Sequence, residues 1–426
     1  MRYDLLIKGG EVVDPGGGHE GRLDVAVEHG RIAAVEADIP AESAFQVIDA
    51  GGQLVMPGLV DFHAHCFEGV TYWGVNPSPV ASRTGVTTWN DAGSPGALTM
   101  DGFRRYAVEP ADVRIRCFMN ISVIGLVGEN YEVANLALCD LELFRRVVDL
   151  NRDLVCGIKV RIGTPTVGDT GVESLRLAVQ AGEECGLPVM VHIAMGPPSI
   201  DDVVELLRPG DIITHSFTGL SMRLIDDEGA IRDSARRAIE RGVLLDIGHG
   251  TGSFSFLTAE ALFAQGYRPD TISSDMHQLS VSGPMFDLPT TMSKFLQLGM
   301  PLADVVRATT ARPAQLLGLD GEVGTFRPGS HADIGLFRLL EGEFPLYDIA
   351  GNERLAGELL RNTLTLVDGR RLPRREPDPL APWVDPIWPS GQVGFTEKQR
   401  RLHELGYTPD ALAAPYERDR EAVSGR

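Results

Sequence analysis

The sequence predicts an α/β fold, namely a (β/α)8 TIM barrel with a small discontinuous β-sandwich domain built from both ends of the chain. Between residues 58 and 319, short apolar runs alternate with amphipathic stretches, as in βα units around a parallel sheet. Outside this range, segments rich in Val and Ile and punctuated by glycine are typical of strands joined by turns. A length of 426 residues suits one large domain plus a smaller one.

The barrel strands are predicted from eight apolar runs, which lie at 59–65, 85–93, 113–122, 154–162, 187–193, 211–217, 242–250 and 270–277. The intervening stretches include 174–186 and 233–242, and both end in glycine, as helix C-termini prefer. Eight such units over about 260 residues match the size of this barrel.

The strand-like segments outside the barrel are 4–14, 23–37, 45–58, 321–337 and 361–372. We therefore expect a sandwich from residues 1–57 plus 320–375, a barrel from 58–319, and a linker and tail from 376–426. Residues 376–392 are rich in Pro and Trp, which predicts an irregular linker. A short helix is expected at 396–406, within a tail that is either an ordered oligomerisation arm or disordered.

The bulk composition limits the partners and the location. A net charge of −20 argues against nucleic acid or an anionic membrane as the main partner. No apolar run of about 18 residues or more predicts a membrane span, and the N-terminus lacks the pattern of a targeting peptide. Five cysteines without CxxC spacing fit reduced thiols. We expect a cytoplasmic protein, a homo-oligomer, acting on a small molecule.

Histidines end several predicted strands, at the C-terminal face where such barrels carry their active sites. His63 and His65 are two apart, so they point to the same side of the first strand. They follow an apolar run, and a buried neutral imidazole needs a partner, for which a metal ion is suited. His192 and His215 end the fifth and sixth strands. Each alone could be a core histidine bonded to a carbonyl, but together with the first pair they favour a metal site.

Lys159 and Asp275 extend this pattern. Lys159 lies inside an apolar strand of a chain with only four lysines, and a buried ammonium is costly unless paired or neutralised. Reaction with carbon dioxide would give a carbamate with two oxygens, one for each of two metal ions. A salt bridge to a barrel carboxylate and an outward-facing lysine are the alternatives. Asp275 ends the eighth strand, where it could bind a metal and accept a proton, or cap a helix.

These features together resemble the amidohydrolase superfamily, in its binuclear variant with a carboxylated lysine, as in dihydroorotases, hydantoinases and phosphotriesterases. The resemblance covers about residues 3–375 and includes MPGLVDFHAH at 56–65 and GTFRPGSHADIGLF at 324–337, which is similar to the accessory sandwich. DIGHGTGSFSF at 246–256 and SGPMFDLPTTMSKFLQLGM at 282–300 are most similar to the deacetylase-type branch near dihydroorotase.

The resemblance implies two divalent metal ions, for which zinc is the usual choice, although the donor types would also accept manganese, iron or cobalt. The implied ligands are His63, His65, Lys159 and Asp275 for one ion, and Lys159, His192 and His215 for the other.

The predicted function is a hydrolase that cleaves an amide or ester bond of a small acyl compound through a hydroxide bridging two metal ions, with Asp275 moving the proton. A cyclic amidohydrolase of the dihydroorotase or hydantoinase kind is the alternative. A scaffold protein that has lost its ligands is disfavoured because all six positions are filled. A one-metal deaminase is disfavoured by Lys159.

Further polar residues are expected near the mouth of the barrel. Arg161 follows the strand-four lysine by two positions, and it could bind a substrate carboxylate or neutralise the carboxylates of the site. His249 and His277 could contact the substrate, or each could be a loop histidine bonded to backbone. Tyr72 and Trp73 suggest a pocket with aromatic walls.

Overall fold

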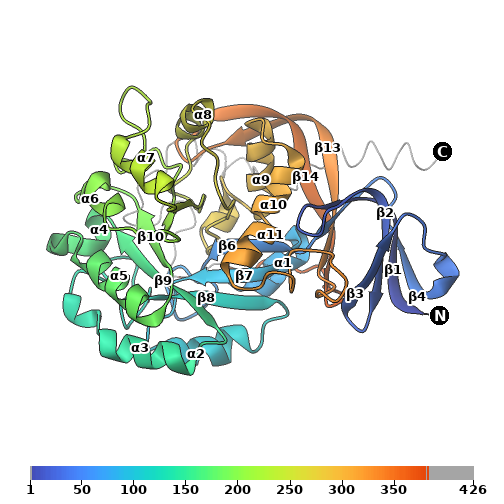
Figure 1. Ribbon diagram of the computed structural model, residues 1–426, viewed down its shortest axis with the longest axis horizontal. Coiled ribbons are helices and arrows are strands. Elements are labelled where there is room, and N and C mark those ends of the chain that lie inside the picture. The colour runs from blue at the N-terminus through green and yellow to red at the C-terminus, as the bar shows by residue number, and fades with distance from the viewer. Residues whose placement is uncertain (1, 380, 383–426) are drawn as a thin grey trace.

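The computed structural model describes residues 2–379 and 381–382, and it shows an α/β fold with a curled parallel sheet and a second, mixed sheet (Figure 1). Most of the predicted linker and the predicted helix at 396–406 lie outside the described residues. Within the described part, no helix is long and apolar enough to cross a bilayer. All five cysteines are free, as expected, and four of them are buried.

Seven parallel strands form the first sheet, in the order β12-β11-β10-β9-β8-β7-β6. Their bounds are β6 (Leu59–Ala64), β7 (Val86–Ala92), β8 (Arg114–Asn120), β9 (Val155–Ile162), β10 (Val189–Ile193), β11 (Ile212–Thr214) and β12 (Leu244–Leu245). These strands coincide with the first seven predicted runs. They bring the C-terminal ends of the runs to one face of the sheet, as in a TIM-barrel-like fold.

The eighth predicted strand, 270–277, is not a regular strand. It is joined to its neighbours by isolated parallel bridges, Asp246 to Thr271 on the β12 side and Ala64 to Met276 on the β6 side. Asp275 has a φ of 49°, which extended backbone does not allow. The segment therefore connects the two edges of the sheet while the backbone at Asp275 turns away from strand geometry.

The helices pack outside this sheet and along the later part of the chain. Their bounds are α1 (Pro77–Thr84), α2 (Met100–Phe103), α3 (Leu141–Leu150), α4 (Thr164–Val167), α5 (Glu173–Cys185), α6 (Ile200–Val204), α7 (Asp233–Glu240), α8 (Phe256–Ala264), α9 (Leu288–Gln297), α10 (Leu302–Ala308) and α11 (Ala311–Leu316). Local sequence sets their ends. The Asp140 side chain accepts from Leu143 N at the start of α3, and Gly186 ends α5 at a φ of 67°.

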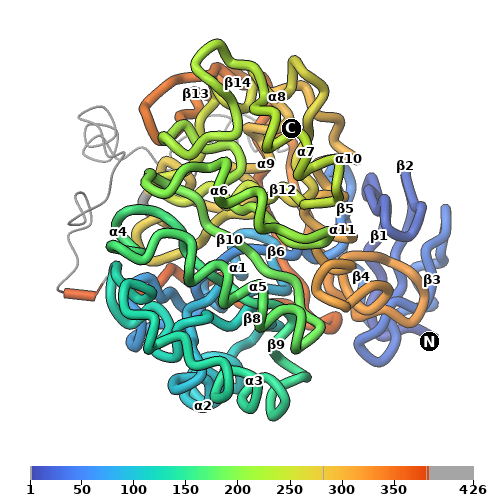
Figure 2. The backbone as a smooth tube through the Cα atoms, turned by 60° about the vertical axis from the view of Figure 1, so that its left-hand side comes forward, coloured from blue at the N-terminus to red at the C-terminus, as the bar shows by residue number. Residues whose placement is uncertain are grey.

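Both chain ends contribute to the second sheet, whose order is β15-β14-β13-β5-β1-β2-β3, with β4 paired to β1. The strands are β1 (Tyr3–Asp14), β2 (His19–Glu28), β3 (Arg31–Glu36), β4 (Ala44–Asp49), β5 (Leu54–Pro57), β13 (Ile334–Tyr347), β14 (Glu353–Val367) and β15 (Arg370–Arg371). Val55 pairs with Leu336, which joins the two ends as predicted. In Figure 2 the N-terminal strands lie against segments from the last part of the chain.

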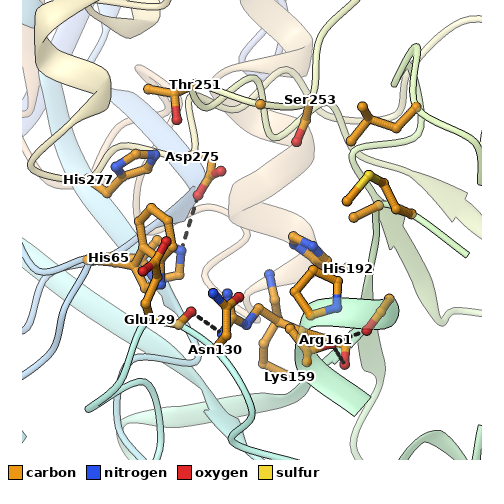
Figure 3. Close-up of a pocket in the computed structure, with 18 residues that line it drawn as sticks. His65, Glu129, Asn130, Lys159, Arg161, His192, Thr251, Ser253, Asp275 and His277 are labelled. Atoms are coloured by element: carbon orange, nitrogen blue, oxygen red, sulfur yellow. Dashed lines mark hydrogen bonds and ion pairs between the residues drawn. The ribbon is translucent and has the colours of Figure 1, made fainter. Parts of the chain in front are cut away.

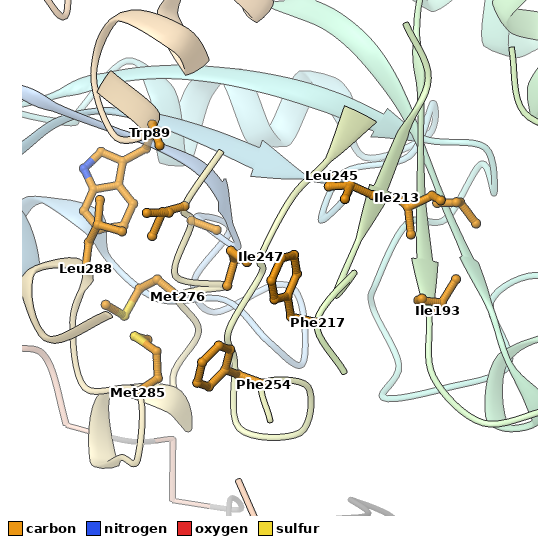
Figure 4. Close-up of a cluster of buried hydrophobic side chains, with 14 of the residues drawn as sticks. Trp89, Ile193, Ile213, Phe217, Leu245, Ile247, Phe254, Met276, Met285 and Leu288 are labelled. Carbon is orange, nitrogen blue, oxygen red and sulfur yellow. The ribbon is translucent and has the colours of Figure 1, made fainter. Parts of the chain in front are cut away.

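The largest apolar core lies between the parallel sheet and its helices. Figure 4 shows part of it, in which Trp89 lies beside Leu288 and Leu245 lies beside Ile213. Each such side chain contributes about 1.5–3 kcal/mol by leaving water. A separate buried cluster contains Phe62 of β6, Phe118 of β8 and Leu317, which follows α11. Packing of these two apolar clusters holds the strands of the parallel sheet in position, and with them the side chains at the strand ends.

A buried lysine connects α9 to the rest of the fold, and the sequence analysis did not single it out. Lys294 is fully buried, and its Nζ donates to the backbone oxygens of Pro284 and Tyr347, both at 2.8 Å. Nζ also lies 2.8 Å from Nε2 of His249. Burial lowers the pKa of Lys294 to about 7. Three acceptors around one amine tie α9, β13 and the segment after β12 together.

We expect the Lys294→Met variant to unfold at a lower denaturant concentration, with a loss of about 2–4 kcal/mol, because it leaves buried acceptors without a donor. Urea unfolding followed by circular dichroism measures this. Lys8→Met is the matched control, since Lys8 forms its ion pairs with Asp24 and Asp38 at a more exposed position. Equal stability of the two variants would contradict this role of Lys294.

Candidate metal centre and substrate cavity

Three predicted ligands meet at the end of β6. Nε2 of His63 lies 3.3 Å from Oδ1 of Asp275, and Nε2 of His65 lies 3.1 Å from the same oxygen. One ligand atom from each of the three residues lies within 4.8 Å of the others. The two histidines point to the same side because they alternate along an extended segment. The arrangement could hold one metal ion.

The other nitrogen of each imidazole is held by a hydroxyl. Nδ1 of His63 lies 2.7 Å from Oγ1 of Thr214, and Nδ1 of His65 lies 3.1 Å from Oγ of Ser94. Both imidazoles are almost fully buried, and this burial holds the pKa of each well below its usual range. Neutral imidazoles oriented through Nδ1 are the form in which histidine binds metals.

His215 and His192 lie on the other side of the same centre. The His215 ring is 5.1 Å from that of His63 and 4.4 Å from that of His192, centroid to centroid. Nδ1 of His215 donates to the backbone oxygen of Gly248 at 2.6 Å, so Nε2 carries the lone pair. Four histidines at the ends of β6, β10 and β11 therefore form one continuous group.

Lys159 lies on β9 beneath these rings and is fully buried. In the described part of the chain, the hydrogen-bond partners of its Nζ are Nε2 of His63 at 3.0 Å and Sδ of Met190 at 3.7 Å. Neither is a carboxylate, so the predicted alternative of a salt bridge is not what the structure shows. Burial lowers the pKa of Lys159 to about 7, which favours the neutral amine.

Two of the predicted ligands have an unusual backbone conformation. His215 has a φ of 63° and Asp275 a φ of 49°, in the left-handed region that costs a side chain with a Cβ about 1–2 kcal/mol. Such strain persists where the surroundings over-determine it, and it is concentrated at functional sites. Here it turns both side chains toward the centre.

Buried atoms without hydrogen-bond partners, and the types of donor present, show that these residues fit a metal ion. Among the described residues, Nε2 of His215 and Oδ1 of Asp275 are buried atoms without a hydrogen-bond partner. An unsatisfied buried polar atom is costly, and both atoms point into the same group of imidazole nitrogens. Nitrogen and carboxylate donors are those that zinc and related divalent ions prefer. All six predicted ligands are thus brought together.

A cavity of about 120 Å³ opens above this centre. Figure 3 shows His65, Lys159, His192 and Asp275 at its wall. The remaining wall comes mainly from loops that follow the strands, and it includes Trp73, Glu129, Asn130, Met195, Leu220, Thr251 and Ser253. The cavity therefore combines apolar and hydroxyl-bearing side chains beside the metal-ligand group.

Arg161 also lines the cavity, and a carboxylate holds it in place. Its Nε and Nη2 donate to the two oxygens of Glu132 at 2.6 and 2.7 Å, and Nη2 also donates to the backbone oxygen of Glu129 at 2.8 Å. The sequence analysis did not predict Glu132, because a glutamate in an irregular loop carries no periodic signal. The pair fixes the plane of the guanidinium.

His277 and Trp73 form an aromatic wall, as predicted for Trp73. Their rings meet edge to face at 4.9 Å, and both line the cavity. The backbone N–H of Leu279 donates to Nδ1 of His277 at 3.3 Å, which leaves the other nitrogen for a ligand. Tyr72 packs on Trp73 but is not among the described residues at the cavity wall.

His249 is placed differently from the prediction. It is fully buried, its Nδ1 lies 2.9 Å from the backbone oxygen of Gly250, and its Nε2 faces Lys294. It stacks on Phe254 and is not among the described residues that line the cavity. Because both ring nitrogens are engaged away from the cavity, this geometry does not support a contact with substrate. A backbone-bonded histidine was the other reading of the sequence, and the structure agrees with it.

Comparison with known proteins gives a family and several relatives. The model of the amidohydrolase family matches residues 54–369. The protein named deacetylase Atu3266 from Agrobacterium fabrum is 39% identical over 325 residues, which are 76% of this chain and 80% of that protein. A crystal structure titled an adenine deaminase has a TM-score of 0.81 at 34% identity, covering 87% of this chain and 99% of that one. A crystal structure titled a dihydroorotase has a TM-score of 0.79 at 34% identity, covering 87% and 98%. The chain belongs to the amidohydrolase family.

Proposed function

We propose that this chain is a metal-dependent hydrolase that removes an acyl group, as a deacetylase does, from a small compound joined through an amide or ester bond. The observation that carries the proposal is the group of six ligand-type side chains beside one cavity, four of which line it, with Nε2 of His215 and Oδ1 of Asp275 lacking hydrogen-bond partners among the described residues. The relative that is 39% identical is named a deacetylase, which favours this chemistry over the others in the family.

Two divalent ions, zinc by preference, are the proposed cofactors. His63, His65, Lys159 and Asp275 would hold one ion, and Lys159, His192 and His215 would hold the other. When bound, such ions lower the pKa of water toward neutrality and polarise a carbonyl oxygen. The protein contributes imidazoles that burial keeps neutral and that are already oriented through Nδ1.

We further propose that Lys159 is a carbamate in the active enzyme. The neutral amine forms an N–C bond to carbon dioxide and releases one proton, which leaves an anion with two oxygens. Its burial without a carboxylate partner supports this, because the amine is otherwise an uncompensated group beside four imidazoles. The carbamate supplies the oxygen that each of the two proposed ligand sets requires.

Asp275 is the proposed proton carrier. Its side chain is 13% exposed and lines the cavity, whereas the carboxylates behind the histidines, such as Asp246, are fully buried. It is therefore the carboxylate that can reach both the attacking water and the leaving nitrogen or oxygen. It would accept a proton from the water and deliver it to the leaving group.

Arg161 and His277 are the proposed substrate contacts. Glu132 and the backbone of Glu129 occupy Nε and Nη2 of Arg161, which leaves Nη1 for a carboxylate of the substrate. His277 offers the nitrogen that Leu279 does not engage. A small acyl compound that carries an acid group fits these donors, such as an N-acyl amino acid or an O-acyl hydroxy acid.

Other predictions from the sequence stay predictions. They are a homo-oligomeric state, a cytoplasmic location, and the division into a sandwich of 1–57 plus 320–375, a barrel of 58–319 and a tail. The strands of both chain ends form one mixed sheet by their hydrogen bonds, so a two-layered sandwich is not evident from the pairing alone.

A hydrolysis screen tests the proposed substrate class. Zinc-loaded protein is incubated with N-acyl amino acids, O-acyl hydroxy acids, dihydroorotate, hydantoins and adenine, and product release is followed by chromatography. We expect turnover of one of the acyl classes. Turnover confined to the cyclic amides would favour the cyclic amidohydrolase alternative, and turnover confined to adenine would overturn the hydrolytic deacylation.

Asp275→Asn is expected to keep its metal and to lose about 10²–10⁴-fold in kcat, because the amide can still ligate but cannot carry the proton. Metal content by plasma emission spectrometry and initial rates on the best substrate measure the two effects separately. Near wild-type turnover of this variant would rule out the assigned role of Asp275.

Lys159→Ala is expected to lose most of its bound metal and its activity, and short-chain carboxylic acids added to the buffer are expected to restore part of both. The added acid supplies two oxygens at the place that the carbamate would occupy. Lys8→Ala, which alters a lysine on the other sheet, is the control and keeps full metal content. Full occupancy in Lys159→Ala without added acid would refute the carbamate.

A further inference from the structure

Behind the metal-ligand group lies a buried carboxylate, Asp246, in the segment after β12. We infer that Asp246 acts through the hydroxyl of Thr214 as a positioning unit that holds His63 in the tautomer with its lone pair on Nε2. The inference rests on the proposed metal site, since a lone pair on Nε2 is the one that faces the other ligands. Neither residue would touch metal or substrate.

The direction of the hydrogen bonds follows from proton counting. Oγ1 of Thr214 donates to Oδ2 of Asp246 at 2.7 Å and lies 2.7 Å from Nδ1 of His63. A hydroxyl has one proton, so once Thr214 donates to the carboxylate it can only accept from the imidazole. Nδ1 of His63 therefore carries the hydrogen, and Nε2 is left with the lone pair.

A second contact is consistent with this assignment. Nζ of Lys159 lies 3.0 Å from Nε2 of His63, where the amine can donate to a lone pair on Nε2. The opposite arrangement, in which Thr214 donates to His63, would require a protonated Asp246.

Other hydroxyls complete the acceptor role of Asp246. Oδ1 accepts from Oγ1 of Thr271 at 2.6 Å and from Oγ of Ser273 at 2.7 Å. Oγ of Ser273 in turn accepts from the backbone N–H of Gly248 at 2.9 Å, so its proton is available for the carboxylate. Three hydroxyls thus donate to Asp246, which fixes the carboxylate as the acceptor for Thr214.

The same residue ties together the stretches that carry three of the ligands. The backbone oxygen of Asp246 accepts from N and Oγ of Ser216, at 3.1 and 2.8 Å, directly after His215. Ser273 stands two residues before Asp275. Space for this arrangement depends on Gly248, where a Cβ would lie 2.5 Å from Oγ1 of Thr214 and 2.9 Å from Nδ1 of His63.

The test compares the same substitution at two hydroxyl donors of Asp246. Thr214→Val removes the acceptor for His63, whereas Thr271→Val removes a donor to Asp246 and leaves His63 untouched. Zinc affinity is measured by competition with a chromophoric chelator, and folding by circular dichroism. We expect a 10–100-fold loss of affinity in Thr214→Val, near wild-type affinity in Thr214→Ser, and little change in Thr271→Val.

Equal losses in the two valine variants, or none in Thr214→Val, would overturn the inference and leave Asp246 with a purely structural role. Nitrogen-15 NMR of histidine-labelled, metal-free wild-type protein tests the tautomer without any variant. A His63 ring protonated on Nε2 would also overturn it. A different result would count against the proposed function alone. In that case wild-type protein would bind no zinc, while His63 would still carry its hydrogen on Nδ1.

Discussion

The Lys159 amine is buried among imidazoles, and the conformation and pairing of the surrounding residues depend on accommodating it there. The side chain is fully buried, and the pKa of Lys159 falls to about 7 because water is excluded. A Cβ at position 93 would lie 2.5 Å from Cγ of Lys159, so the neighbouring strand end needs a glycine there. An ammonium in such a place is unfavourable unless a partner compensates it, and the carbamate proposed above converts it into an anion between two cations.

The imidazoles around Lys159 need hydrogen-bond partners of their own, and these partners are further buried polar groups. Each imidazole of the β6 pair is oriented by a hydroxyl, and the hydroxyl behind His63 is oriented in turn by Asp246. Such networks are stabilising only when every member is paired. Nε2 of His215 and Oδ1 of Asp275, which lack a hydrogen-bond partner among the described residues, both face the centre. The network around Lys159 thus leaves these two atoms available to the proposed metal ions.

The sequence was sufficient for those features that follow from periodicity. The predicted convergence of His63, His65 and the histidines and lysine at other strand ends is what the structure shows, because parallel strands present their C-terminal ends on one face. The eighth run failed as a strand because Asp275 turns out of extended geometry. A positive φ at a residue other than glycine is imposed by tertiary contacts, and no local pattern announces it.

Contacts between distant segments could not be predicted in the same way. His249 looked like a strand-end histidine, yet its Nε2 meets Lys294, which lies on α9 and 45 positions later in the chain. Lys294 carried a usable signal, since it is one of four lysines and stands in a largely apolar helix. The reasoning that identified Lys159 would have marked it as a buried amine in need of acceptors, although not which acceptors.

The relatives show why the frame of this fold does not determine the reaction. Structures titled an adenine deaminase and a dihydroorotase share the fold of this chain at the same identity of 34%, and a relative named a deacetylase reaches 39%. The strand ends that carry the proposed ligands belong to the parallel sheet, whereas Arg161 with its Glu132 partner, and Trp73 with His277, depend on loops or on contacts made by loops. In the proposed enzyme, selectivity among amides, esters and ring compounds would therefore come from how these side chains orient a substrate beside the centre, because substrates are discriminated by contacts that differ between their transition states.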